Sequence, residues 1–168
     1  AIVQYLISEY AGPLSPKNNE LAARSNMYWG WVQDYYSFVL SPFHDIITGH
    51  NEVFWRNLRL TDSLADGGQE TGVANLTTLH KKRLNYLETH LVDVKAGPFL
   101  TGPDCSYADI FLYTCVRAVE ECGGFGVLRD SCNGQPFSEF KIVSDIVNAV
   151  GEIAIVKAGK SKFADSPI

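Results

Sequence analysis

The chain has 168 residues, of which 46% are hydrophobic and 12% aromatic, enough to bury the core of one globular domain. Its 14 Lys and Arg residues stand against 19 Asp and Glu residues, and the formal net charge of -5 offers no general attraction for nucleic acid or anionic lipid. No apolar run approaches the roughly 20 residues that span a bilayer, and no secretory-signal pattern occurs. We therefore expect a soluble protein that binds neither nucleic acid nor membranes.

Cysteine and histidine spacing gives no metal signature. The cysteines form no C-x-x-C pair, and the histidines show neither an H-E-x-x-H pair nor acidic neighbours at ligand spacing. We expect reduced thiols, solvated or core-edge histidines and no metal ion. Cys115 and Cys122 share one face of an expected helix, where free cysteine packs as a small apolar residue, so a core position is favoured over a redox role.

The first residues of the chain carry apolar side chains at helical spacing, but no N-cap residue precedes them. We therefore expect the chain to begin inside a helix, with a further segment upstream of Ala1. Gly12-Pro13 and Ser15-Pro16 then interrupt the helix, because proline lacks an amide hydrogen and disfavours helical geometry in the residue before it. Residues 12–17 are expected to form a linker.

A long helix is predicted from Asn18 to Leu40, with Pro42 as its bend or end, because apolar residues recur near one stripe. This segment is unusually rich in aromatic residues: Tyr28, Trp29, Trp31, Tyr35 and Tyr36. Ordinary packing between helices explains such a group, and so does the lining of a pocket for an apolar ligand. The sequence leaves both interpretations open.

Residues 61–72 are polar and glycine-bearing, which predicts a loop. The following segment, 73–94, has alternating three- and four-residue spacing of apolar positions and is the clearest amphipathic helix in the chain. A turn is expected at 97–102. Ser106 and Asp109 then have the spacing of a capping box, which opens a buried helix that runs to Gly123-Gly124. A structural role explains both residues, and replacing Asp109 with Ala is expected to cost about 1 kcal/mol through the lost cap.

Beyond a glycine-bearing loop, Pro136 is predicted to occupy the first turn of another helix, and the helical period continues from Phe137 to Val150. Gly151 is expected to end or bend this helix. Nowhere does the chain show a sustained alternating pattern of the kind that predicts strands. The sequence therefore predicts an all-α fold.

The leucine-rich helix, the turn Phe99-Leu100-Thr101-Gly102 and the capping segment Ser106-Tyr107-Ala108-Asp109 resemble, in that order, the C-terminal helical domain of cytosolic glutathione transferases. The opening Ala1-Ile2-Val3-Gln4-Tyr5-Leu6 resembles the last helix of that family's thioredoxin-like N-terminal domain. The resemblance implies a glutathione-transferase C-terminal-type helical bundle over residues 18–168, preceded by a linker at 12–17 and the last thioredoxin-like helix at 1–11. Most of the N-terminal domain would be missing. The family's usual "P-x-I" is Gly151-Glu152-Ile153 here.

In that family the thioredoxin-like half binds glutathione and activates its thiol, so the resemblance implies a catalytic residue upstream of Ala1 and none in this chain. The helical half lines the pocket of the second, electrophilic substrate. The resemblance places Phe111 and Cys115 in that pocket, as in sigma-like members, and approximate register in the long helix adds Tyr28, Trp31 and Tyr35.

Two functions from different classes follow from the resemblance. The first is a glutathione transferase: a cytoplasmic homodimer that uses glutathione as co-substrate and no metal, conjugates apolar electrophilic small molecules, and is inactive as this chain alone. The alternative is a non-catalytic binding or assembly domain, as in elongation factor 1 gamma or the S-crystallins. A third interpretation, an unrelated helical bundle, is disfavoured by the ordered series of motifs.

Overall fold

The structure is a computed structural model that describes residue 14, residues 16–42, 69–92, 97–122, 125–153 and residue 156. Helices make up most of these ranges, and within them no strand forms; only an isolated antiparallel bridge joins Phe99 to Gly102. The predicted all-α fold is thus confirmed. The helix expected at 1–11 lies outside the described residues, as do residues 12, 13 and 15 of the expected linker.

The first long helix, α2, spans Asn19–Tyr35 and continues as a π-helical turn, η2, at Tyr36–Leu40. Asn18 is its N-cap, because the Asn18 side chain accepts a 2.9 Å hydrogen bond from the amide of Leu21. The buried stripe of α2 consists of Ser25, Tyr28, Val32 and Tyr35. The helix agrees with the predicted one, and helical geometry persists to Pro42.

The second long helix, α5, spans Gln69–Val92 and carries a buried stripe at Leu76, His80, Leu84 and Leu87. The loop predicted over 61–72 is wrong at its end, because α5 already begins at Gln69; residues 61–68 lie outside the described part of the chain. A glycine inside a helix costs only about 1 kcal/mol. A long run of hydrogen-bonded residues offsets that cost, so the glycine at position 72 does not end the helix.

The turn before helix α6 is tight and depends on glycine. Phe99 and Gly102 exchange two backbone hydrogen bonds, of 3.1 and 3.2 Å, and Gly102 has a φ of 120°. A Cβ atom on Gly97 would lie 2.4 Å from the Gly102 carbonyl oxygen, so the two backbone segments can approach this closely only with glycine at 97. Helix α6 then spans Tyr107–Glu121, close to the predicted range.

The chain after α6 differs from the prediction. A short helix, α7, forms at Gly126–Ser131, and α8 spans Lys141–Gly151, so the helix predicted to begin at Pro136 starts later. Residues 136–139 form turns instead, because proline fixes a backbone angle that suits a turn as well as a first helical turn. Gly151 ends α8 as expected.

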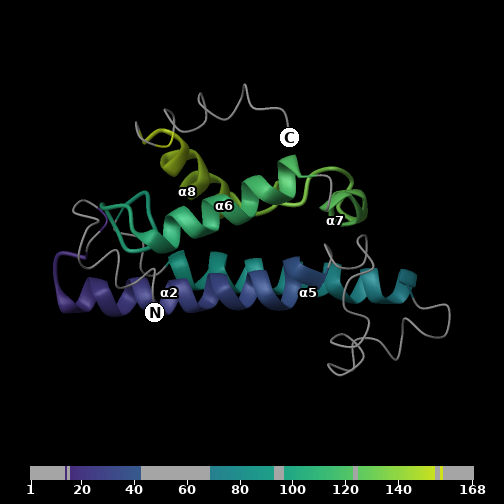
Figure 1. The fold of residues 1–168 in the computed structure, drawn as a ribbon, viewed down its shortest axis with the longest axis horizontal. Helices are drawn as coiled ribbons and strands as arrows, with labels where there is room; N and C mark the ends of the chain where they lie inside the picture. Colours follow the sequence, from purple (N-terminus) through teal and green to yellow (C-terminus); the bar gives the residue numbers. More distant parts are fainter. Residues whose placement is uncertain are drawn as a thin grey trace.

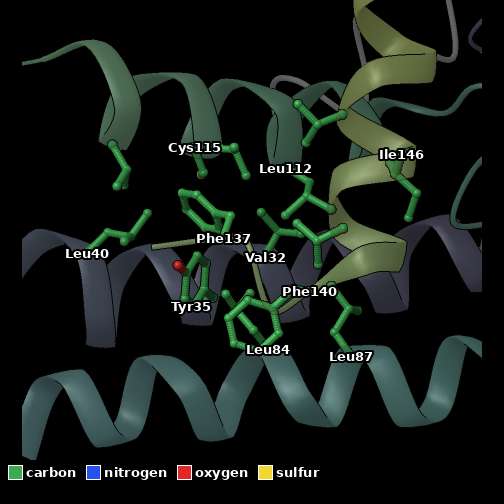
Figure 2. Close-up of a cluster of buried hydrophobic side chains, with 14 of the residues drawn as sticks. Val32, Tyr35, Leu40, Leu84, Leu87, Leu112, Cys115, Phe137, Phe140 and Ile146 are labelled. Atoms are coloured by element: carbon green, nitrogen blue, oxygen red, sulfur yellow. The ribbon is translucent and has the colours of Figure 1, made fainter. Parts of the chain in front are cut away.

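Helix α6 runs alongside α2 and also contacts α8, which is drawn above it in Figure 1. Helix α5 contacts η2, α7 and α8. Figure 2 shows the core where these helices meet, with Val32, Tyr35, Leu84, Leu112 and Phe140 pointing toward one another. Among the helices described, none is both long and apolar enough to cross a bilayer.

Candidate functional site

The five predicted substrate-binding residues lie in two environments. Tyr28, Tyr35 and Cys115 belong to the buried core, and Tyr35 has no exposed surface at all. Trp31 and Phe111 are only partly buried and pack against the edge of that core. Because a ligand reaches an enclosed side chain only if the core opens, the geometry allows direct contact at Trp31 and Phe111 alone. The binding role of all five stays a prediction.

A second group of aromatic rings joins α2 and η2 to the first turns of α6. The rings of Trp29 and Phe111 lie 4.6 Å apart between centroids, and Trp29 meets Tyr107 edge to face at 5.6 Å. The ring centroids of Tyr36 and Phe111 lie 6.2 Å apart, and the Tyr36 side chain is 43% exposed. We name Trp29, Tyr36, Tyr107 and Phe111 the aromatic face. Tyr107 is buried, but the partly exposed rings of Trp29, Tyr36 and Phe111 offer planar apolar surface on which an aromatic molecule can stack.

The aromatic face was only partly predictable. The sequence placed Trp29 and Tyr36 in an aromatic group and Phe111 in the pocket, but Tyr107 only in the capping segment, although it precedes Phe111 by one helical turn and therefore shares its side of α6. The hydroxyl of Tyr107 donates a short hydrogen bond to the side-chain oxygen of Asn26. This contact ties the start of α6 to α2 and holds the Tyr107 ring against Trp29.

The capping box at the start of α6 fixes where that helix begins. One carboxylate oxygen of Asp109 accepts hydrogen bonds from the Ser106 amide at 2.8 Å and the Ser106 hydroxyl at 2.6 Å. The other oxygen accepts from the Leu100 amide at 2.7 Å, so Asp109 also fastens the preceding turn. Burial raises the pKa of the Asp109 carboxyl, while the hydrogen bonds from Leu100 and Ser106 oppose that rise. Ser106 and Asp109 therefore position Tyr107 and Phe111 of the aromatic face through α6, on which both residues lie.

A buried polar chain crosses the core beside the predicted pocket residues. The Tyr35 hydroxyl lies 2.9 Å from Nδ1 of His80, and Nε2 of His80 lies 2.8 Å from the Pro136 carbonyl oxygen. His80 is fully buried, whereas the sequence favoured solvated or core-edge histidines. Its position on the apolar stripe of α5 was the feature of the sequence that could have indicated its burial. The ring of Trp31 stacks on that of Tyr35, with 5.7 Å between centroids, so the buried hydrogen-bonded groups contact one of the accessible predicted residues.

The thiols and the cavity give no sign of chemistry of their own. Burial raises the pKa values of Cys105 and Cys115 to about 12, so both thiols are protonated near neutral pH and are poor nucleophiles.

A small cavity between the start of α2 and the turn before α6, lined by Ser25 and Thr101 among others, has room for about one water molecule. In the described ranges, no three His, Cys, Asp or Glu side chains gather as a metal ion requires.

Comparison with known proteins identifies the family. The family described as "Glutathione S-transferase, C-terminal domain" matches residues 67–158, which is more than half of the chain and includes α5, α6, α7 and α8. No curated protein and no solved structure gives a significant match. The matched range contains the turn and the capping box on which the resemblance rested. The chain belongs to the glutathione S-transferase C-terminal domain family.

Proposed function

We propose that the intact protein is a glutathione transferase in which this chain supplies the binding surface for an apolar electrophile. Glutathione is the co-substrate, and a residue upstream of Ala1 activates its thiol. In this proposal residues 1–11 are the last helix of a thioredoxin-like domain, 12–17 the linker and 18–168 the helical domain. Family membership supports the assignment, and the aromatic face is the single observation in the structure that carries it.

The aromatic face suits a planar apolar substrate. Trp29 and Phe111 come from two different helices, and Tyr36 leaves part of its ring exposed beside them. Each aromatic contact of this kind contributes about 0.5–1.5 kcal/mol beyond the area that it buries. We therefore add Trp29 and Tyr36 to Phe111 as the accessible residues of the proposed electrophile site, whereas Trp31 stacks on Tyr35 and lies outside the aromatic face.

The proposed role of this surface in catalysis is positioning. An electrophile stacked on the aromatic face would be presented to the glutathione thiolate, whose sulfur forms the new bond to carbon as the leaving group departs with the electron pair of the broken bond. Holding two reactants in register in this way removes much of the entropic barrier to their reaction. The thiolate is the reactive form of the co-substrate, so its stabilisation belongs to the proposed upstream residue.

Binding of an aromatic electrophile to the chain tests the proposed surface. Isothermal titration calorimetry with 1-chloro-2,4-dinitrobenzene is expected to show binding that Phe111→Ala weakens roughly 2- to 13-fold, since about 0.5–1.5 kcal/mol of ring contact is lost. The matched control is Phe38→Ala, because Phe38 is 42% exposed on η2 and lies outside the aromatic face. Equal losses in both variants would remove the aromatic face from the proposal.

Binding of glutathione tests the proposed enzyme as a whole. A longer protein that includes the residues upstream of Ala1 is expected to bind immobilised glutathione and to conjugate it, whereas the 168-residue chain alone is expected to do neither. A longer protein that binds no glutathione would instead favour the alternative role of a binding or assembly domain, as in elongation factor 1 gamma or the S-crystallins.

We further propose that the protein is a homodimer in the cytoplasm. Large apolar side chains stand exposed at Met27, which is 60% exposed, and Tyr86, which is 52% exposed, and burial of such groups favours self-association. All four cysteines are free, as expected in a reducing compartment. Sedimentation velocity is expected to give twice the chain mass of 18.6 kDa, and a monomer at micromolar concentration would contradict the dimer.

A further inference from the structure

The buried chain of Tyr35, His80 and Pro136, which we name the relay, joins three parts of the fold that are distant in sequence. Tyr35 is the last residue of α2, His80 lies in the middle of α5, and Pro136 lies in the turn that leads to α8. The rings of Phe137 and Phe140 meet the imidazole edge to face at 5.5 and 6.1 Å. The imidazole is therefore enclosed by all three parts.

The hydrogen-bond partners determine which nitrogen of His80 carries the proton. The Pro136 carbonyl oxygen can only accept, so Nε2 of His80 must donate to it. Nδ1 is then free of a proton in the neutral ring and accepts from the Tyr35 hydroxyl. In this neutral form every donor of the relay has an acceptor, which explains how these polar groups lie within an apolar core.

A second proton on His80 would break this arrangement. An N–H at Nδ1 would face the Tyr35 oxygen, which can accept only if the hydroxyl turns its own hydrogen away. Tyr35 is fully buried, and its ring stacks on Trp31, so a displaced hydroxyl hydrogen would find at best the weak sulfur acceptors of Cys115 and Cys132. The imidazolium would also hold an uncompensated charge in the core.

The charged groups around His80 offset one another. The charge of Lys81 on α5 lowers the pKa of His80, and the charge of Glu139 in the turn before α8 raises it. Their effects oppose each other, and the two side chains form an ion pair with 2.8 Å between Nζ and Oε1. From α2 the facing titratable group is Tyr35, and the thiols of Cys115 and Cys132 lie near its hydroxyl. Burial is the main influence and lowers the pKa of His80, while the hydrogen bond to the Pro136 carbonyl opposes it.

We propose that the relay is an acid-sensitive joint that fastens residues 132–140 and α8 to α5 while His80 is neutral and releases them when it is protonated. The unfolded chain takes up the proton near the ordinary histidine pKa of about 6.5, and the folded chain only at lower pH. The contribution of neutral His80 to the free energy of unfolding is therefore complete above about pH 6.5 and is lost as the pH falls. A single such group changes the folding equilibrium by up to about tenfold per pH unit.

The proposal is tested by urea unfolding of the full chain at pH 7.5 and 5.5. His80→Gln retains an amide donor and an amide oxygen acceptor but does not titrate, and His90→Gln is the control, since His90 is exposed on the same helix. Between pH 7.5 and 5.5 the folding equilibrium constant of the wild type is expected to fall about tenfold more than that of His80→Gln, and His90→Gln is expected to behave like the wild type. If the free energy of unfolding depends on pH in the same way for the wild type and His80→Gln, the proposal is wrong.

Two measurements on the wild-type chain keep the test decisive even if His80→Gln does not fold. Nitrogen-15 NMR is expected to show the Nε2–H form of His80 without titration between pH 8 and 5.5; titration near pH 6.5 in the folded chain would overturn the proposal. Amide exchange, corrected for its intrinsic pH dependence, is expected to rise on acidification more in residues 132–140 than in α6. An equal rise in both segments would also overturn it.

Discussion

Replacement of Asp109 by Ala tests how much one buried carboxylate contributes to this fold. The carboxylate accepts hydrogen bonds from the amides of Leu100 and Ser106 and from the Ser106 hydroxyl, and Asp109 has no exposed surface. Loss of a helix cap costs about 1 kcal/mol. A buried donor left without an acceptor costs about 1–3 kcal/mol. Since two backbone amides lose their acceptor, we expect a total loss of about 3 kcal/mol, more than the capping box alone predicts.

The assay is urea unfolding followed by circular dichroism at neutral pH. Asp109→Asn separates hydrogen bonding from volume, because it keeps the shape but turns a donor toward the amides, and it is expected to destabilise the chain to a similar extent. Asp104→Ala is the control, since Asp104 makes an exposed ion pair with Lys17, worth at most about 1 kcal/mol. A loss below about 1 kcal/mol for Asp109→Ala, equal to that of the control, would refute the reasoning.

Three further predictions concern other parts of the fold. Arg129→Met removes a guanidinium that binds the last carbonyls of α6 at 2.6 and 2.8 Å and is expected to cost about 2 kcal/mol in urea unfolding. Gly30→Ala is expected to raise stability by about 0.5–1 kcal/mol, because a Cβ meets nothing within 4 Å in this helix, whereas Gly97→Ala is expected to lower it through the clash with the turn. Cys122 is exposed, contrary to the core position expected for it, because it is the extended C-cap residue of α6 and no longer follows the helical face of Cys115. Ellman's reagent is therefore expected to label Cys122 within minutes and buried Cys115 only after unfolding; equal rates would contradict the packing.

Local signals in the sequence predicted α2, α5 and α6 well, because each has a strong apolar period and α6 has a capping box. The region after Gly124 was harder, since its turns depend on backbone angles that composition does not specify. Asn133 and Gly134 both take positive φ values, of 54° and 77°, and Pro136 fits a turn as readily as a helix. The short helix α7 has too few residues to show a period.

The candidate site shows where register limits sequence reasoning. Consecutive residues on a helix point about 100° apart, so a one-residue error exchanges a buried ring for an accessible one. Tyr28 and Tyr35, predicted from approximate register to bind substrate, belong to the buried core, while their neighbours Trp29 and Tyr36 are part of the aromatic face; the binding role of all four stays a prediction. The burial of His80 was not predicted, although its place on the apolar stripe of α5 could have indicated it. Its hydrogen-bond partners on α2 and before α8 depend on tertiary packing that one sequence does not reveal.

The rate of glutathione conjugation by the intact protein tests the central proposal most directly. With 1-chloro-2,4-dinitrobenzene as the electrophile, a protein that includes the residues upstream of Ala1 is expected to exceed the uncatalysed rate. Phe111→Ala is expected to lower kcat/KM roughly 2- to 13-fold through the lost ring contact, while Phe38→Ala is expected to match the wild type. Conjugation no faster than the uncatalysed reaction, or equal kcat/KM for Phe111→Ala and the wild type, would contradict the proposed electrophile site.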